Sequence, residues 1–160
     1  QLQSMIHGMV LGGGQIERQL RLLLDRFLEV HGVQGVLPIP LNFQFETGPH
    51  TRPAPLRDER GIYLFFRDNE WLRIGQTGYS QRFTSQHYGT RRAGSTFAAD
   101  LWNNREHFGF EGDEARIDAW ILENFGRANI RIPARDGDAM SRLLEAFLHL
   151  NLRPRFEGRR

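Results

Sequence analysis

A phenol and a guanidinium occur together on one short stretch of the chain, where they could bind an anion. Tyr63 and Arg73 lie in two apolar, alternating runs, residues 61–66 and 71–75, which flank the polar connection 67–69. Alternation on both sides of a short polar segment indicates a β-hairpin. We therefore expect the two side chains to lie side by side on one sheet face. The simpler interpretation is a half-exposed hairpin that carries an ordinary aromatic and cation pair.

The alternation also predicts how the two strands pair. A single apolar face forms only if Tyr63 lies opposite Arg73 across a three-residue loop, because a shift of one residue would divide the apolar set between both faces. The expected apolar face consists of Ile62, Leu64, Phe66, Leu72 and Ile74. The expected opposite face consists of Tyr63, Phe65, Trp71 and Arg73.

The composition excludes several kinds of site. The chain of 160 residues is long enough for one domain, and it contains no cysteine. Disulfides, thiolate metal sites and cysteine nucleophiles are therefore excluded, and a reducing compartment is indicated. No apolar run has the length of a membrane helix, and the N-terminus lacks the order of a secretory signal. We expect a soluble, cytoplasmic protein with no membrane partner.

The basic residues are all arginine, 21 in number, which removes Schiff-base lysines and the lysine of a Walker A phosphate loop. They gather near aromatic residues in two stretches: Arg82, Arg91 and Arg92 with His87, and Arg153, Arg155, Arg159 and Arg160 at the C-terminus. A guanidinium grips phosphate oxygens in a fork, so this pattern is typical of phosphate binding. A genome rich in arginine codons would produce the same bias.

Hydrophobic periodicity predicts the elements around the hairpin. We expect helices over residues 15–30, 80–87, 95–104 and 114–125, a strand over 128–133, and a last helix that begins at Asp138 and ends before Pro154. Ser80 and Ser95 are the expected N-caps of their helices. Residues 32–56 hold five of the seven prolines and predict irregular structure, with one short strand near 41–45.

These elements predict an α+β fold with a small three-stranded, mostly antiparallel sheet flanked by helices, and an N-terminal helical and proline-rich extension. Residues 1–4 precede Met5 and are set aside as a possible expression remnant. We expect residues 5–56 to form the N-terminal helix and irregular arm, and residues 57–160 to form the main domain.

Four ordered features resemble one known family. Gly61-Ile62-Tyr63 and Arg73-Ile74-Gly75 match the two tripeptides that name the GIY-YIG nucleases, the first in full and the second in two of three places. Arg82 stands where the family has an arginine, and Glu145 precedes a tail with proline and an aromatic residue, 152–156. From Gly61 to the C-terminus the chain is similar to restriction-enzyme-like or related bacterial members.

The resemblance implies a metal-dependent endonuclease that hydrolyses DNA phosphodiester bonds. In that interpretation Tyr63 is the general base, Arg73 stabilises the tyrosinate, Arg82 neutralises phosphoryl charge and Glu145 holds Mg²⁺ or Mn²⁺. The expected partner is DNA, and a homodimer would let the enzyme cut both strands. The residues expected to contact nucleic acid are Trp71, His87, Arg91, Arg92, Arg153 and Arg155.

Three positions depart from the family pattern. Arg73 replaces the second tyrosine, and Glu157 stands where asparagine usually ends the motif, although Asn151 is a nearby substitute. Gln86 occupies the place where some members have histidine, with His87 one residue on.

The departures keep other interpretations open. The main alternative is a catalytically weak or inactive nucleic-acid-binding module of the same fold. A plain interaction domain is a third possibility. In these cases Tyr63 is a packed aromatic residue, Arg82 is a solvated helix residue, and Glu145 simply pairs with Arg142 or His149 across one helical turn.

Overall fold

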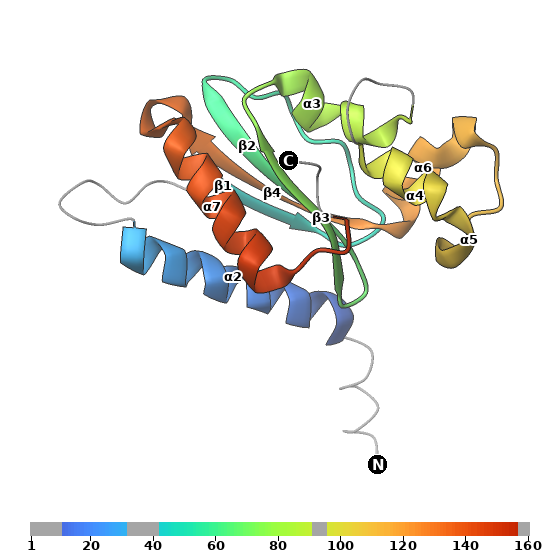
Figure 1. Ribbon diagram of the computed structural model, residues 1–160, viewed down its shortest axis with the longest axis horizontal. Helices are drawn as coiled ribbons and strands as arrows, with labels where there is room; N and C mark the ends of the chain where they lie inside the picture. The colour runs from blue at the N-terminus through green and yellow to red at the C-terminus, as the bar shows by residue number, and fades with distance from the viewer. Residues whose placement is uncertain (1–10, 32–41, 91–95, 157–160) are drawn as a thin grey trace, which may run out of the picture.

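The chain folds into one antiparallel sheet with helices on both faces (Figure 1). The computed structural model describes residues 11–31, 42–90 and 96–156. The strands are β1 (Asn42–Glu46), β2 (Glu59–Arg67), β3 (Glu70–Thr77) and β4 (Gly126–Pro133). The α-helices are α2 (Leu11–His31), α3 (Ser80–Thr84), α4 (Phe97–Asn103), α5 (Arg105–Phe108), α6 (Ile117–Asn124) and α7 (Gly137–Leu152). Short 3₁₀ turns are η1 (Gln86–Tyr88), η2 (Glu114–Arg116) and η3 (Ala134–Asp136).

The sheet has four strands in the order β1-β4-β2-β3, so the expected three-stranded sheet is wrong. The additional strand is β1, which pairs antiparallel with β4 from Asn42 opposite Arg131 to Glu46 opposite Arg127. This is the short strand predicted within the proline-containing segment. The α+β class is confirmed, and β3 forms one edge of the sheet while β1 forms the other.

The predicted hairpin forms, but its predicted register is wrong. Tyr63 pairs with Gly75, and Arg73 pairs with Phe65. A β-bulge shifts the register between Phe65 and Phe66, and pairing then continues to Arg67 opposite Glu70. The turn is therefore shorter than the three residues expected, because the extra residue lies in β3 as a bulge and not in the loop.

The bulge exchanges two side chains between the faces of the sheet. Trp71 packs in the cluster that contains Ile62 and Leu64, whereas Leu72 packs in the cluster that contains Tyr63. This reverses the predicted placement of Trp71 and Leu72. The hairpin is also not half-exposed, because residues 61–66 are buried throughout.

Each face of the sheet carries its own hydrophobic cluster. One lies under α2 and α7, and it includes Leu20, Phe27, Ile130 and Leu148. The other lies under α3, α4 and α6, on the opposite side of the sheet in Figure 1. The N-terminal helix is thus packed against the same sheet as α7. Both faces of the central strands are therefore covered, so that even the polar residues alternating along β4, Arg127, Asn129 and Arg131, are buried.

The helix starts differ in detail from those expected. The first helix begins at Leu11, four residues before the predicted start, and its apolar stripe faces the sheet. Thr96 caps α4 by accepting a hydrogen bond from the Ala99 amide, while the expected cap Ser95 lies outside the described residues. The Ser80 hydroxyl accepts from the Leu56 amide and does not cap α3. Among the described helices, none is long and apolar enough to cross a membrane.

Candidate functional site

The Tyr63 side chain reaches across the hairpin to the edge strand β3. Tyr63 is 2 % exposed, and its hydroxyl and Cζ lie where a Cβ on Gly75 would be. Any larger residue at position 75 would collide with the phenol. The absence of a side chain at Gly75 therefore brings the Tyr63 hydroxyl to the backbone of the sheet edge.

The Glu145 carboxylate approaches the same segment of β3 from the other face of the sheet. Glu145 lies on α7, and its Oε1 is 3.7 Å from His149 Nε2 one turn later. The His149 Nε2 lies 3.0 Å from the Ile74 carbonyl, to which it donates. Tyr63 thus reaches the Gly75 backbone directly, whereas Glu145 is linked to the neighbouring Ile74 carbonyl through His149, on the opposite face of the sheet. Of the two alternative partners expected for Glu145 across one helical turn, Arg142 pairs with Asp138 instead, whereas the contact with His149 does form.

The C-terminal tail lines the same edge just before this point. The Arg155 and Phe156 amides donate to the carbonyls of Trp71 and Leu72, so the tail runs parallel to β3 along its outer side as far as Arg73. The next edge carbonyl, that of Ile74, is the one bound by His149. The described part of the tail, up to Phe156, thus lies beside β3 just before the segment of Ile74 and Gly75.

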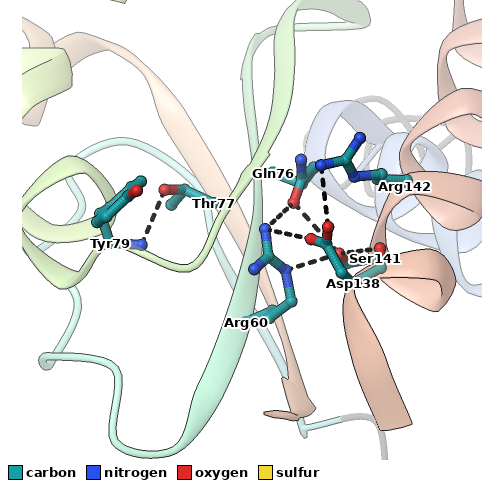
Figure 2. Close-up of polar contacts among 7 residues, drawn as sticks. All are labelled: Arg60, Gln76, Thr77, Tyr79, Asp138, Ser141 and Arg142. Atoms are coloured by element: carbon teal, nitrogen blue, oxygen red, sulfur yellow. Dashed lines mark hydrogen bonds and ion pairs between the residues drawn. The ribbon is translucent and has the colours of Figure 1, made fainter.

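Arg82 lies on α3, immediately after β3, and is partly exposed. The start of this helix is fixed by the Tyr79 amide, which donates to Thr77 Oγ1 at 3.0 Å (Figure 2). Arg82 is one of three arginines, with Arg73 and Arg127, whose charges reach His87. Arg82 therefore lies near enough to His87, the ring neighbour of Tyr63, for its charge to lower the pKa of that histidine.

His87 is packed in the core and not on the surface. It is 0 % exposed, and its ring centroid is 4.2 Å from that of Tyr63. Its Nδ1 accepts from the Phe97 amide, whereas none of the described residues gives its Nε2 a hydrogen-bond partner. Burial, followed by the charges of nearby arginines, lowers the pKa of His87 well below its ordinary value of 6.5. It is a neutral neighbour of Tyr63 in this conformation.

Arg73 is also buried, and its charge is offset. It is 3 % exposed and forms an ion pair with Asp100 on α4. Burial raises the pKa of the Asp100 carboxyl, and the Arg73 charge acts in the opposite direction. The guanidinium lies diagonal to Tyr63 on the same face, and not directly opposite as predicted.

Arg127 is a buried cation that the sequence analysis did not select. It is 1 % exposed, and its guanidinium donates to Asn129 Oδ1 (2.7 Å), Tyr88 Oη (3.0 Å) and the Phe83 carbonyl (2.6 Å). It lies 6.0 Å from the Tyr63 ring centroid. No described carboxylate forms an ion pair with Arg127, and burial lowers its pKa. Arg127 lies on β4, where the polar residues Arg127, Asn129 and Arg131 alternate with apolar ones. This alternation is the sequence signal that could have identified a polar face of the strand.

The remaining predicted residues include nucleic-acid contacts (Trp71, Arg91, Arg92, Arg153 and Arg155) and the possible site residues Gln86, Asn151 and Glu157. Trp71 is 4 % exposed, and its indole N–H donates to Gln19 Oε1, so its ring offers a ligand little surface. Arg153 and Arg155 are exposed, although Arg155 Nε pairs with Glu70 at 2.6 Å. Gln86 is partly exposed, and the exposed Asn151 donates to the Phe147 carbonyl of its own helix. Arg91, Arg92 and Glu157 lie outside the described residues.

A polar cluster joins β2, β3 and α7 next to Gly75 (Figure 2). Arg60 donates to Gln76 Oε1 (2.7 Å) and Ser141 Oγ (2.9 Å), and it pairs with Asp138 (2.8 Å). These contacts hold the first turns of α7 against the end of the hairpin. Sequence reasoning missed this cluster because its residues come from three separate segments.

A surface groove of about 430 Å³ lies on another part of the molecule, beside Tyr88. Its charged groups already have partners, since Arg52 pairs with Asp118 at 3.3 Å and Thr90 hydrogen-bonds to Glu114. The charged side chains that line the groove are therefore paired with one another or with a neighbouring hydroxyl.

The donor set around Glu145 limits which metal could bind. Among the described residues no three or more His, Asp or Glu side chains gather as a metal site. This does not fit a transition-metal centre with three protein ligands. One partly exposed carboxylate does fit Mg²⁺, which takes one or two carboxylates and completes its shell with water and phosphate oxygens.

Comparison of the chain with protein-family models, with curated proteins and with solved structures found no match in any of the three. The interpretation of the site therefore depends on the sequence pattern and on the contacts described above.

Proposed function

We propose that the protein is a magnesium-dependent endonuclease that hydrolyses DNA phosphodiester bonds. The observation that carries the proposal is that the Tyr63 hydroxyl lies beside Gly75 at the β3 edge, while His149, the neighbour of the Glu145 carboxylate, binds the carbonyl of the preceding residue, Ile74. Tyr63 and Glu145 are the two groups for which the resemblance to GIY-YIG nucleases implies a general base and a cation ligand. Arg82, on the next helix α3, adds a positive charge near His87, whose ring packs against that of Tyr63.

In this proposal each residue has a distinct task. Tyr63 accepts the proton of the attacking water, and Arg82 neutralises charge on the phosphoryl oxygens as it develops. Glu145 holds a divalent cation, which would polarise the phosphate and lower the pKa of bound water. The core cation beneath Tyr63 is Arg127, because the Arg73 charge is offset by Asp100.

The test is cleavage of supercoiled plasmid with Mg²⁺ or Mn²⁺. Tyr63→Phe should lower the rate by roughly 10²- to 10⁴-fold, the usual contribution of a general base. Glu145→Ala should abolish cleavage, while Glu111→Ala, which removes an exposed carboxylate elsewhere, should cleave like wild type. Wild type that leaves the plasmid intact with either cation would refute the proposal.

A second candidate function is nucleic-acid binding without cleavage. Two observations favour it: Tyr63 is 2 % exposed, and Arg73 is paired with Asp100 and cannot act as a free cation toward substrate. This function predicts that wild type and Glu145→Ala both shift DNA on a gel, in a salt-dependent manner, without cutting it. A plain interaction domain predicts no salt-dependent shift.

A further inference from the structure

The Gln76 side chain is held in one orientation next to the candidate site. Gln76 follows Gly75 on β3, and Arg60 Nη2 lies 2.7 Å from its Oε1. Since a guanidinium has only donors, the carboxamide atom that faces it must be the oxygen. The Ser141 hydroxyl lies 3.2 Å from the same oxygen (Figure 2). The Nε2 amide group is therefore on the side away from these two contacts.

The residues that fix Gln76 are themselves fixed. Arg60 Nε donates to Ser141 Oγ at 2.9 Å, and Arg60 Nη2 pairs with Asp138 Oδ1 at 2.8 Å. Arg142 Nη2 pairs with the other Asp138 oxygen at 2.9 Å. Arg60 Nη1 fills the space beside Gly78, 2.7 Å from where a Cβ would be. A donor held by so many contacts needs little reorganisation to bind a ligand.

The Gln76 amide lies on the same side of β3 as Glu145. Along α7, Ser141 contacts Gln76 and His149 contacts Ile74, with Glu145 one turn from each. Residues four apart on a helix share a face, so Glu145 lies along β3 between these two contacts. Gln76 is partly exposed, and no described residue accepts a hydrogen bond from its Nε2.

The cluster that holds Gln76 is positively charged. Arg60 and Arg142 contribute two guanidinium groups and Asp138 one carboxylate, which leaves one net positive charge within the cluster; the neighbouring Glu145 carboxylate is the group proposed to be neutralised by a divalent cation. We infer that Gln76 Nε2 donates a hydrogen bond to a non-bridging phosphate oxygen of bound DNA. This inference rests on the proposed function insofar as DNA is the ligand. The competing explanation is that Gln76 only holds Arg60 and α7 in place.

Gln76→Glu separates these two explanations. The new carboxylate has the same shape and keeps both acceptor contacts, including that to Arg60, so the folded protein should melt at the wild-type temperature or above. The substitution also replaces the Nε2 amide donor by a negatively charged oxygen beside the phosphate. The Kd for a fluorescein-labelled DNA duplex, measured by anisotropy in EDTA, should rise about tenfold or more, since a hydrogen bond to a charged group is lost. Plasmid cleavage in Mg²⁺ should fall as well.

Gln44→Glu is the matched control. Gln44 is exposed on β1, at the opposite edge of the sheet, so the same charge change there should leave binding nearly unchanged. Gln76→Met is the second variant, because it removes the donor without adding charge. It should weaken binding as well, whether or not Gln76→Glu folds.

The outcomes distinguish this inference from the proposed function. Wild type that binds DNA without cutting it, with Gln76→Glu and Gln76→Met still weaker binders, refutes the endonuclease and supports the Gln76 contact. Folded Gln76→Glu or Gln76→Met that binds like wild type overturns the Gln76 contact alone. Wild type that binds no DNA overturns both.

Discussion

At the scale of single residues, the candidate site depends on the absence of a side chain at Gly75. The Tyr63 ring occupies the position of a side chain at residue 75, so the phenol can cross the hairpin to the outer strand. With its hydroxyl beside the β3 backbone, Tyr63 is buried and yet lies near the sheet edge. Glycine at this position is a steric requirement of the close approach, and no unusual backbone conformation is involved.

Gly75→Ala tests this close approach. The added methyl group must displace the Tyr63 ring in a packed core, and overpacking of this kind costs about 1–3 kcal/mol. The free energy of unfolding, measured by urea denaturation, should fall accordingly, and plasmid cleavage should be lost with the displaced hydroxyl. Gly89→Ala is the control, because an added Cβ there meets nothing within 4 Å. Equal stabilities of the two variants would contradict the model of the site.

Sequence reasoning predicted some of these residues and misplaced others for physical reasons. Tyr63 and Glu145 were selected by resemblance, and their segments do meet at β3. Trp71 was placed on the wrong face of the sheet because the bulge in β3 adds one residue, so the residues of β3 that precede the bulge point to the opposite face from the one expected. Arg127 was missed because a charged residue in a strand normally predicts a solvent-exposed face, whereas two of its three acceptors, Tyr88 Oη and the Phe83 carbonyl, belong to segments distant in sequence.

At the scale of elements, two histidines join loops and short helices to the core. His50 Nδ1 donates to the Phe125 carbonyl and its Nε2 accepts from Tyr88 Oη at 2.8 Å, so the loop before β2 is tied to η1. His87, on the same turn, accepts from the Phe97 amide at the start of α4. Both contacts require an uncharged imidazole with one acceptor nitrogen.

These histidines should make stability depend on pH. Burial lowers the pKa of both His50 and His87 from the ordinary value of 6.5, so below that pH the unfolded chain binds protons that the folded chain does not. The free energy of unfolding should therefore fall as pH drops below 6.5, with a slope of up to about 1.4 kcal/mol per pH unit for each histidine. Urea denaturation at a series of pH values measures the slope.

Two other groups bear on this pH dependence: Asp100, whose titration opposes it, and His107, which serves as the control position. Asp100 has a raised pKa and therefore opposes the trend, but it does so at lower pH, toward its ordinary value of 3.8. The slope is best measured just below pH 6.5. His87→Gln should reduce the slope, whereas replacement of the exposed His107 by alanine should not. A stability that is constant from neutral pH to pH 5 would show that neither imidazole is held neutral by the fold.

Helices and strands could be predicted from the sequence where their hydrophobic pattern is local. The pairing of segments that are distant in the chain could not. The apolar stripes of α2 and α7 and the alternation of the hairpin identify those elements from the sequence alone. The membership of β1 in the sheet depends on its pairing with β4, over eighty residues later in the chain. The Arg60 cluster likewise depends on how α7 packs on the hairpin, which no local pattern encodes.

At the scale of the whole molecule, one sheet lies between the two hydrophobic clusters, and its strands contribute side chains to both. Strand β2 contributes Leu64 to the cluster under α2 and α7, and Phe65 to the cluster under α4 and α6. Loss of either cluster would leave one face of the same strands exposed to water. The two clusters should therefore unfold together, in spite of the distance between α2 and the candidate site along the chain.

Leu20→Ala and Leu22→Ala on α2 test this coupling. Leu20 is 0 % exposed and Leu22 is 55 % exposed, so the same truncation should cost about 2–5 kcal/mol at the first position and less than about 0.5 kcal/mol at the second. Far-UV circular dichroism reports all helices, whereas Trp102 and Trp120 pack against the cluster on the face opposite α2. The measurement is made in a Trp71→Phe background, because Trp71 packs in the α2 cluster and would report α2 itself. Because one sheet supports both clusters, the Leu20→Ala midpoint in urea should move equally for tryptophan fluorescence and circular dichroism. A fluorescence transition that stays at the wild-type midpoint while the dichroism shifts would mean that α2 detaches by itself, and that the edge carrying Gly75 is stabilised independently of the N-terminal helix.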